Sequence, residues 1–246
     1  MRRAEVVHTH HQTLEIWKST LATEFRVQGA VHAAYHQRRF LTGLAWDMIA
    51  ASVLLGKNHP PRSVLMLGLA GGTAFRIVRQ LLPDCQLTAI DIDPEIVELA
   101  RRHMDLDALG IEVIFGDAYA WLATNRRSFD VVIDDIYLAG KTDVFRPRAW
   151  DDGLLAHLQQ AVAPGGLLAV NLVTGEGHRT MQSFTRRVLR GAFPVVRKIQ
   201  SIQAMNEVLV AGDFVATGRR LLPYENSFSD WRDREFWRRL QVSLVS

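Results

Sequence analysis

The chain has 246 residues, of which 48% are hydrophobic and 22% are charged, and its formal net charge is +3. These values are typical of a globular protein with room for one large α/β domain and a small appendage. The sequence has no apolar run of the ~18 residues that a membrane span needs and no secretory signal, and its single cysteine, Cys85, excludes an intrachain disulfide and a cysteine metal cluster.

We therefore expect a cytoplasmic protein that binds no membrane. The arginines occur in short pairs between acidic residues, a pattern typical of solvated helix faces, so we expect no nucleic-acid partner. Three histidines near the N-terminus, His8, His10 and His11, have no acidic or cysteine partner at a ligand spacing, and we expect no metal site.

The first 57 residues predict a small segment of strands and one helix. Residues 13–17 and 24–27 are expected to pair as strands, and residues 39–55 to form a helix. The run 58–61, Asn-His-Pro-Pro, follows that helix, and consecutive prolines neither continue a helix nor join a central strand. This boundary divides an N-terminal extension, 1–57, from a core at 58–218, and the basic residues 219–246 are expected to form a helical tail.

The core alternates apolar runs with amphipathic segments. Apolar runs predict strands at 64–67, 87–90, 111–115, 129–133 and 167–172, and amphipathic segments predict helices at 74–82, 94–106, 151–162 and 179–189. Residues 195–202 and 207–212 are close enough in sequence to form a final hairpin. We therefore expect an α/β fold with a doubly wound, mostly parallel, seven-stranded Rossmann-like sheet.

The residues that follow the first three core strands are candidates for a site, because open α/β sheets bind ligands at the carboxyl ends of their strands. A turn of small residues, Gly68 to Thr73, lets the backbone approach a ligand closely, although a tight turn without a ligand is the alternative. Asp91 follows about twenty residues later and can accept hydrogen bonds from ribose hydroxyls. Asp117, after the third strand, can accept a hydrogen bond from an adenine amine.

Two acids, Asp134 and Asp135, follow the fourth strand. Because side chains alternate along a strand, we expect only Asp135 to reach the cleft, while Asp134 bonds to backbone or holds the next loop. In the cleft, Asp135 can orient or deprotonate a nucleophile, and a carboxylate with a purely structural role is the alternative. Acids at three strand ends suit ribose, adenine and a cationic sulfonium better than a pyrophosphate.

At these residues the chain resembles the spermidine synthase-like branch of the class I S-adenosylmethionine-dependent methyltransferase superfamily. The resemblance covers about residues 62–212 and lies in the segments 64–73, 89–97, 116–118, 129–135 and 163–171. It implies S-adenosylmethionine or its decarboxylated form as the cofactor, Asp135 as the catalytic group, and an N-terminal element that shapes the substrate pocket and supports a homodimer. The cofactor-binding residues that it implies are Gly68, Ala70, Gly71, Gly72, Asp91, Ile92, Asp117, Ala118 and Asp135.

The chain departs from the polyamine-forming members of this branch at two places. Those enzymes carry an aspartate in the glycine turn, where this chain has Gly71, and a second Asp-Pro pair after the catalytic aspartate, where this chain has Ile136 to Ala139. Because a polyamine needs several carboxylates to replace its hydration, methyl transfer to an amine or hydroxyl of a small molecule is the favoured activity. Aminopropyl transfer is the alternative, and a non-catalytic scaffold of the same fold is a further one.

The substrate side is expected to involve residues from several segments. The gate is the loop from Tyr137 to Trp150, whose basic residues Lys141, Arg146 and Arg148 could accept an acidic substrate. The candidate substrate residues are Gln12, Tyr35, Trp46, Tyr137 and His178, the last as a second-choice base.

Overall fold

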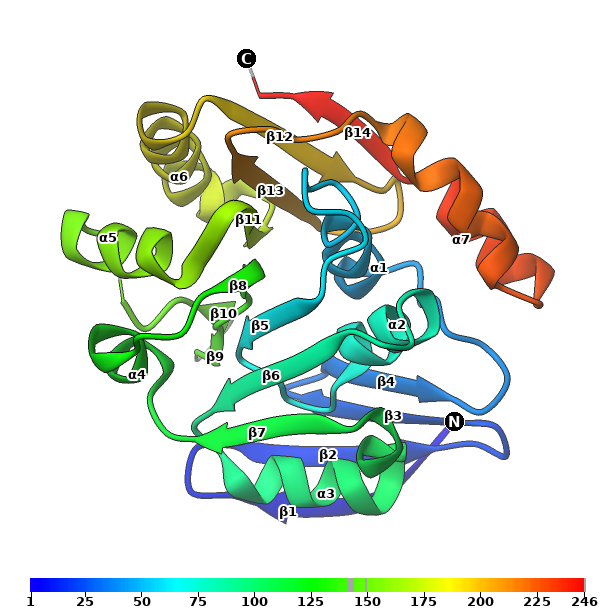
Figure 1. The fold of residues 1–246 in the computed structure, drawn as a ribbon. Helices are drawn as coiled ribbons and strands as arrows, with labels where there is room; N and C mark the ends of the chain where they lie inside the picture. Colours follow the sequence, from blue (N-terminus) through cyan, green and yellow to red (C-terminus); the bar gives the residue numbers. More distant parts are fainter. Residues whose placement is uncertain (141–143, 149, 246) are drawn as a thin grey trace.

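The computed structural model describes residues 1–140, 144–148 and 150–245. Within these residues the centre of the molecule is an eight-stranded sheet in the order β14-β12-β13-β11-β8-β5-β6-β7 (Figure 1). Neighbours from β11 to β7 are parallel, and β13, β12 and β14 are antiparallel to their neighbours. The strands are β5 (Ser63–Leu67), β6 (Gln86–Asp91), β7 (Ile111–Phe115), β8 (Phe129–Asp134), β11 (Val162–Val173), β12 (Val195–Gln200), β13 (Asn206–Gly212) and β14 (Gln241–Leu244).

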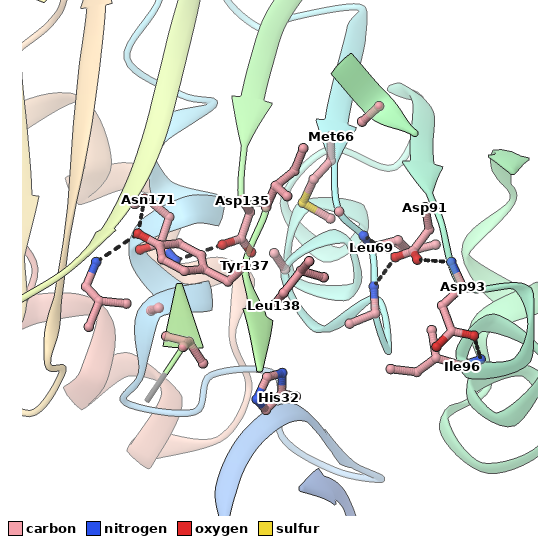
Figure 2. A pocket seen from close by; sticks show the side chains of 18 of the residues that line it. His32, Met66, Leu69, Asp91, Asp93, Ile96, Asp135, Tyr137, Leu138 and Asn171 are labelled. Carbon is pink, nitrogen blue, oxygen red and sulfur yellow. Dashed lines mark hydrogen bonds between the residues drawn. The ribbon is translucent and has the colours of Figure 1, made fainter. Parts of the chain in front are cut away.

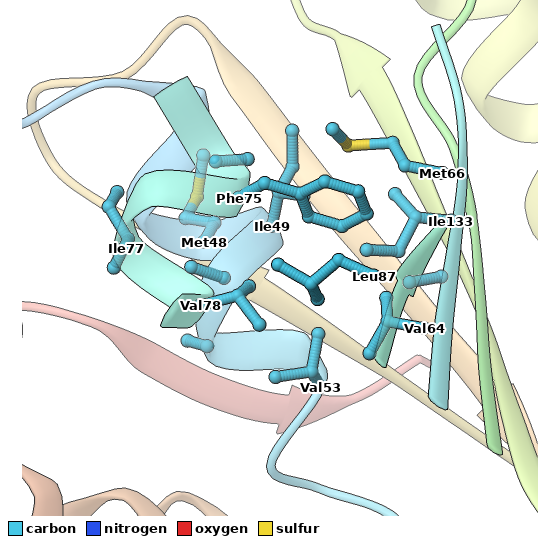
Figure 3. Packing of buried hydrophobic residues seen from close by; sticks show 14 of the residues in the cluster. Met48, Ile49, Val53, Val64, Met66, Phe75, Ile77, Val78, Leu87 and Ile133 are labelled. Atoms are coloured by element: carbon cyan, nitrogen blue, oxygen red, sulfur yellow. The ribbon is translucent and has the colours of Figure 1, made fainter. Parts of the chain in front are cut away.

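Helices cover both faces of the sheet, which confirms the predicted doubly wound, mostly parallel architecture. Alternate residues of β5 show why: Val64 and Met66 pack into one hydrophobic cluster (Figure 3), and Leu65 and Leu67 into another on the opposite face. The first cluster includes residues of α1 (Ala45–Ser52), α2 (Thr73–Leu81), α3 (Pro94–Met104) and the short 3-10 helix η1 (Leu106–Leu109). The second includes residues of α4 (Ala118–Thr124), α5 (Asp152–Ala161) and α6 (Arg179–Ala192).

The C-terminal residues differ from the expected helical tail. They form η3 (Gly218–Ser227) and α7 (Trp231–Arg238), but then add β14 to the sheet beside β12, with Val242 opposite Ile199. The sheet therefore has eight strands rather than the expected seven. A four-residue strand of mixed polarity at a sheet edge leaves little periodic signal, which is why the sequence pattern missed it.

The N-terminal residues form a separate four-stranded antiparallel sheet, β1 (Arg2–His8), β2 (Thr13–Lys18), β3 (Ala22–Val27) and β4 (Ala30–His36), in chain order. The expected pairing of 13–17 with 24–27 is confirmed, with Ile16 opposite Phe25. Figure 1 shows this sheet beside β6, β7 and α3. None of the helices in the described residues is long and apolar enough to span a membrane.

The expected helix at 39–55 is shorter than predicted, because its first part is held as a loop. The carboxylate of Asp233 on α7 accepts hydrogen bonds from the backbone N–H groups of Phe40 and Leu41 at 2.8 and 3.2 Å. That of Asp47 accepts from the N–H groups of Thr42 and Gly43 at 2.9 and 2.7 Å. These bonds satisfy the backbone without helical turns, so α1 begins only at Ala45.

Candidate active site

One cavity of about 640 Å³ lies at the carboxyl ends of the parallel strands (Figure 2). Residues that follow β5, β6 and β7 line one half of it. The other half is lined by the N-terminal sheet, the start of α1, the segment after β8, and the ends of β11 and β13. The cavity therefore lies where open α/β sheets bind ligands.

The N-terminal sheet closes this cavity through the turn between β1 and β2. The hydroxyl of Thr9 donates a hydrogen bond to Oδ2 of Asp93 at 2.7 Å, and the backbone N–H of His10 donates to Oε2 of Glu95 at 2.8 Å. The next residues, His11 and Gln12, line the cavity. The N-terminus of α3 is thus the place where the extension is fastened over the core.

The glycine turn after β5 is shaped by close backbone contacts. Gly68 has a φ of +85°, and a Cβ atom there would lie 2.7 Å from the carbonyl oxygen of Asp135, so only glycine fits. The N–H groups of Leu69 and Ala70 both donate to Oδ2 of Asp91 at 2.8 Å. The N–H of Asp93 donates to Oδ1 of Asp91 at 2.9 Å. Asp91 therefore ties the turn to the end of β6 while it lines the cavity wall.

Burial in this wall raises the pKa of Asp91, and the backbone donors of Asp93, Ala70 and Leu69 oppose that rise. Each carboxylate oxygen has two lone pairs, so Asp91 keeps acceptor capacity for a ligand hydroxyl.

Gly71 and Gly72 lie in the turn but do not line the cavity. A Cβ atom at Gly71 would collide with the Cβ of Ala33 on β4 and would lie 2.6 Å from the sulfur of Met104 on α3. A Cβ atom at Gly72 would collide with Leu106. These two glycines allow the turn to pack under the N-terminal sheet, because the packing leaves no room for a side chain at either position.

The segment after β7 contributes Asp117 and Ala118 to the cavity, and Ile92 lines it from the end of β6. Asp117 is also the N-cap of α4, because its Oδ1 accepts from the N–H groups of Tyr119 and Ala120 at 2.8 and 3.0 Å. The helix cap orients this carboxylate at the cavity wall, with its second oxygen available to a ligand.

Asp135 lines the centre of the cavity, between its two halves (Figure 2). Its backbone N–H donates to the carbonyl of Leu67 at 3.0 Å, and its Oδ1 accepts from Nδ2 of Asn171 at 2.7 Å. Burial raises the pKa of Asp135 to about 7, with the Asn171 hydrogen bond and the charge of Arg146 acting in the opposite direction. A carboxyl group with such a pKa can accept or hold a proton near neutral pH.

Asp134 is fully buried on the other face of β8 and does not line the cavity. Its Oδ2 accepts from Nη1 of Arg146 at 2.7 Å, and both side chains are almost completely inaccessible to solvent. Burial, the largest single influence, would by itself lower the pKa of Arg146, but Asp134, Tyr137 and Tyr119 together outweigh it and the pKa is raised. Asp134 therefore holds the loop that follows β8.

This ion pair changes the interpretation of the basic gate. Arg146 is neutralised by Asp134 and cannot serve as the expected acceptor of an acidic substrate. Arg148 is exposed and pairs with Asp151 at 3.0 Å, and Lys141 lies outside the described residues. No arginine or lysine lines the cavity within the part of the chain that the structure describes.

Three of the five candidate substrate residues line the cavity: Gln12, Trp46 and Tyr137. Tyr137 donates its hydroxyl hydrogen to the carbonyl of Asn171 and accepts from the N–H of Val173, both at 3.1 Å, so its polar atom is already used by the backbone. The structure does not bring Tyr35 or His178 to the cavity. Tyr35 instead lies under the guanidinium of Arg76, 4.4 Å from ring centre to Cζ, and His178 ends the short helix η2 (Glu176–His178).

Sequence reasoning missed several lining residues, above all His32, Asn171, Met205 and Asn206. Asn171 could have been found, because it stands near the carboxyl end of the predicted fifth strand. Burial lowers the pKa of His32, which favours its neutral form. Met205 and Asn206 lie at the turn between two antiparallel strands, where no local motif marks a site.

The chain was compared with known proteins. A model of the family described as "Methyltransferase domain" matches residues 64–166. A probable polyamine aminopropyl transferase of Bifidobacterium longum is 32% identical over 133 residues, which cover 54% of this chain and 28% of that protein. The eEF1A lysine and N-terminal methyltransferase of Danio rerio is 26% identical over 200 residues, which cover 78% of this chain and 28% of that protein.

The chain thus spans little more than a quarter of the length of these two relatives. Among solved structures, a probable spermidine synthase from Corynebacterium glutamicum has the same fold, with a TM-score of 0.69 and 15% sequence identity. That alignment covers 99% of this chain and 91% of the other. The likeness therefore includes the N-terminal sheet and the C-terminal strand as well as the core.

Proposed function

We propose that this chain belongs to the spermidine synthase-like branch of the class I methyltransferase superfamily and is an S-adenosylmethionine-dependent enzyme that transfers a methyl group to an amine or hydroxyl of a small molecule. The observation that carries the proposal is the glycine turn. It holds no carboxylate and has no room for one at Gly71, where a side chain would collide with β4 and α3.

The half of the cavity that follows β5, β6 and β7 suits the nucleoside part of the cofactor. Gly68 to Ala70 let the backbone come close to a ligand, Asp91 has acceptor capacity for the ribose hydroxyls, and Asp117 has an oxygen for the adenine amine. When bound, S-adenosylmethionine supplies a methyl group on a positively charged sulfur, which is already activated for transfer.

The chain's own residues then have to align the acceptor and take its proton. Asp135 lies between the two halves of the cavity, and its pKa near 7 allows it to accept a proton from an ammonium or hydroxyl group. Methyl transfer would replace the carbon–sulfur bond of the donor with a bond to the acceptor nitrogen or oxygen, and Asp135 would receive the proton that the acceptor loses.

The acceptor half of the cavity favours a molecule with at most one positive charge. Its wall is largely apolar, with Trp46, Leu138 and Met205 among its members, and Asp135 is the acidic side chain that reaches it among the described residues. A multiply charged amine would need further carboxylates to replace its hydration.

Aminopropyl transfer is the second candidate, and the names of several relatives support it. The Bifidobacterium longum relative and others are named as polyamine aminopropyltransferases, whereas the Danio rerio relative is named as a methyltransferase. The homodimer and the cytoplasmic location expected from the sequence also remain proposals. Light scattering after size-exclusion chromatography tests the oligomeric state.

Calorimetric titration of the purified protein with S-adenosylmethionine and with its decarboxylated form tests the proposal. We expect preferential binding of the intact form, lost in Asp91→Ala and kept in Asp213→Ala, which removes an exposed acid outside the cavity. Incubation with labelled methyl donor and a panel of small amines and alcohols then identifies the acceptor. Preference for the decarboxylated form would favour aminopropyl transfer, and binding of neither would favour the non-catalytic scaffold.

A further inference from the structure

Two asparagines, Asn171 and Asn206, form a chain of hydrogen bonds that ends at Asp135. Figure 2 shows Asn171 on the side of Asp135 away from Asp91. Nδ2 of Asn206 donates to Oδ1 of Asn171 at 3.1 Å, and Nδ2 of Asn171 donates to Oδ1 of Asp135 at 2.7 Å. We propose that Asn171, with Asn206 as its anchor, is a positioning residue that keeps Asp135 oriented and favours its ionised form. The proposal deepens the proposed function and rests on it for the role of Asp135 as proton acceptor.

The strand register places these side chains together. β11 and β13 are antiparallel, with Asn171 opposite Val208 and Val173 opposite Asn206, so Asn171 and Asn206 are diagonal neighbours on one face of the sheet. β11 is parallel to β8, with Val170 beside Asp134, so the next residues along the two strands, Asn171 and Asp135, are also neighbours. Asn171 is thus placed to connect β13 to the end of β8 across β11.

The backbone of Asn171 is fixed as firmly as its side chain. Its carbonyl oxygen accepts from Nη2 of Arg146 at 2.7 Å and from the hydroxyl of Tyr137 at 3.1 Å. Only 5% of the residue is exposed. With its main chain held from one side and its amide oxygen held by Asn206, the amide nitrogen has little freedom except to point at Asp135.

The direction of the amide follows from charge. If the Asn171 amide were turned over, its oxygen would face the carboxylate of Asp135 and its nitrogen would face the nitrogen of Asn206. Both contacts would be repulsive while Asp135 is ionised. The ionised carboxylate therefore selects the orientation in which Asn171 donates, Asn206 donates to the amide oxygen that this orientation leaves, and a donor to the charged form of a carboxyl group favours that form.

The other charged and titratable groups near Asp135 are Asp134, Arg146 and Tyr137. Asp134 and Arg146 form their own buried ion pair, and burial raises the pKa of Tyr137. The Asn171 amide is uncharged, and its hydrogen bond to Asp135 can offset the desolvation of that carboxylate without bringing a charge into the cavity.

The test is a pH titration of the aspartate carboxyl carbons by 13C NMR, with the Asp135 signal assigned by its absence in Asp135→Asn. Asn171→Leu keeps nearly the same volume and removes the donor. We expect it to move the Asp135 midpoint upward by about one to two pH units, as expected when a hydrogen bond to a charged group is lost. Asn206→Ala leaves the donor but frees its orientation, and we expect a smaller upward shift.

Asn125→Ala is the matched control. Asn125 has a similar exposure, 7%, and its amide also makes two hydrogen bonds, to the backbone of Arg127, but it does not touch the cavity. It should leave the midpoint unchanged. Midpoints for Asn171→Leu and Asn206→Ala within about 0.2 pH units of the wild-type value would overturn the proposal, and if Asn171→Leu does not fold, Asn206→Ala decides.

Because the titration needs no substrate, it separates this proposal from the proposed function. If the protein is an active transferase, the acid limb of kcat/KM should move in the same order as the NMR midpoints. Full activity of Asp135→Asn would remove the role of Asp135 as proton acceptor, while the NMR shifts would still report whether Asn171 controls its ionisation.

Discussion

The Arg146–Asp134 ion pair offers the sharpest test of the structure, because one substitution there should have a large and specific cost. In Arg146→Leu, Asp134 would remain fully buried without its charged partner, and the carbonyl of Asn171 would lose a 2.7 Å hydrogen bond. Removing one member of a buried ion pair typically destabilises a protein by about 3–5 kcal/mol. We expect a loss of that size.

Urea unfolding followed by tryptophan fluorescence measures this loss. Trp150, buried near the end of the same loop, should respond to unfolding there. The double variant Arg146→Leu/Asp134→Asn should be more stable than Arg146→Leu, because it no longer buries an unpaired charge. Arg148→Leu, which breaks the exposed pair with Asp151, should leave the stability nearly unchanged.

A loss below about 1 kcal/mol in Arg146→Leu would refute this reasoning, since it lies well under the cost that breaking a buried ion pair typically has. It would mean that the Arg146 side chain is not paired with Asp134. An unpaired Arg146 is what a gate that binds an acidic substrate would require.

Three other predictions concern Asp135 and the glycine turn. Asp135→Asn should lower kcat/KM by about 10²–10⁴-fold in a methyl-transfer assay, and an equal rate would contradict a role in proton transfer. Burial raises the pKa of Asp135 from its ordinary value of 3.8 to about 7 in the folded state. Between these two pH values Asp135 is therefore protonated in the folded protein and ionised in the unfolded chain. Thermal unfolding should show that stability falls as pH rises from about 4 to about 7, less steeply in Asp135→Asn; identical slopes would count against the raised pKa. Gly71→Ala should lower the free energy of unfolding, measured in urea, by about 1–3 kcal/mol, because Ala33 and Met104 fill the space that the new methyl group would need. In the control, Gly191→Ala in α6, the new methyl group meets no atom within 4 Å and should not destabilise the protein.

Local chemistry explains the parts of the fold that the sequence predicted well. Asp93, Pro94 and Glu95 predict a helix start, and the carboxylate of Asp93 does accept from the N–H groups of Glu95 and Ile96 at 3.1 and 3.2 Å. The buried strands were found because residues with both faces covered form continuous apolar runs. Helix α4, which is only seven residues long, and strand β14 were missed because they are too short for a periodic pattern.

The candidate site shows a similar division. Asp91, Asp117 and Asp135 were found because each follows a strand, and strand ends meet at one edge of the sheet. Tyr35 and His178 were expected near the substrate, but the first packs on Arg76 and the second lies beyond the cavity. These two expectations rested on residue type alone, and residue type does not indicate where a side chain points.

The sequence by itself determined the order of strands and helices, the glycine turn and the acids at the strand ends, because these depend on residues within one or two turns of each other. Only the tertiary structure decided that Asp135, which the sequence already directs to the cleft, is buried enough for its pKa to be raised. It also decided that Arg146 is a buried partner of Asp134, and that Asn206 stands behind Asn171. Each of these depends on a contact between strands or loops distant in the chain, and burial, which sets the charge of such groups, exists only once those segments have packed together.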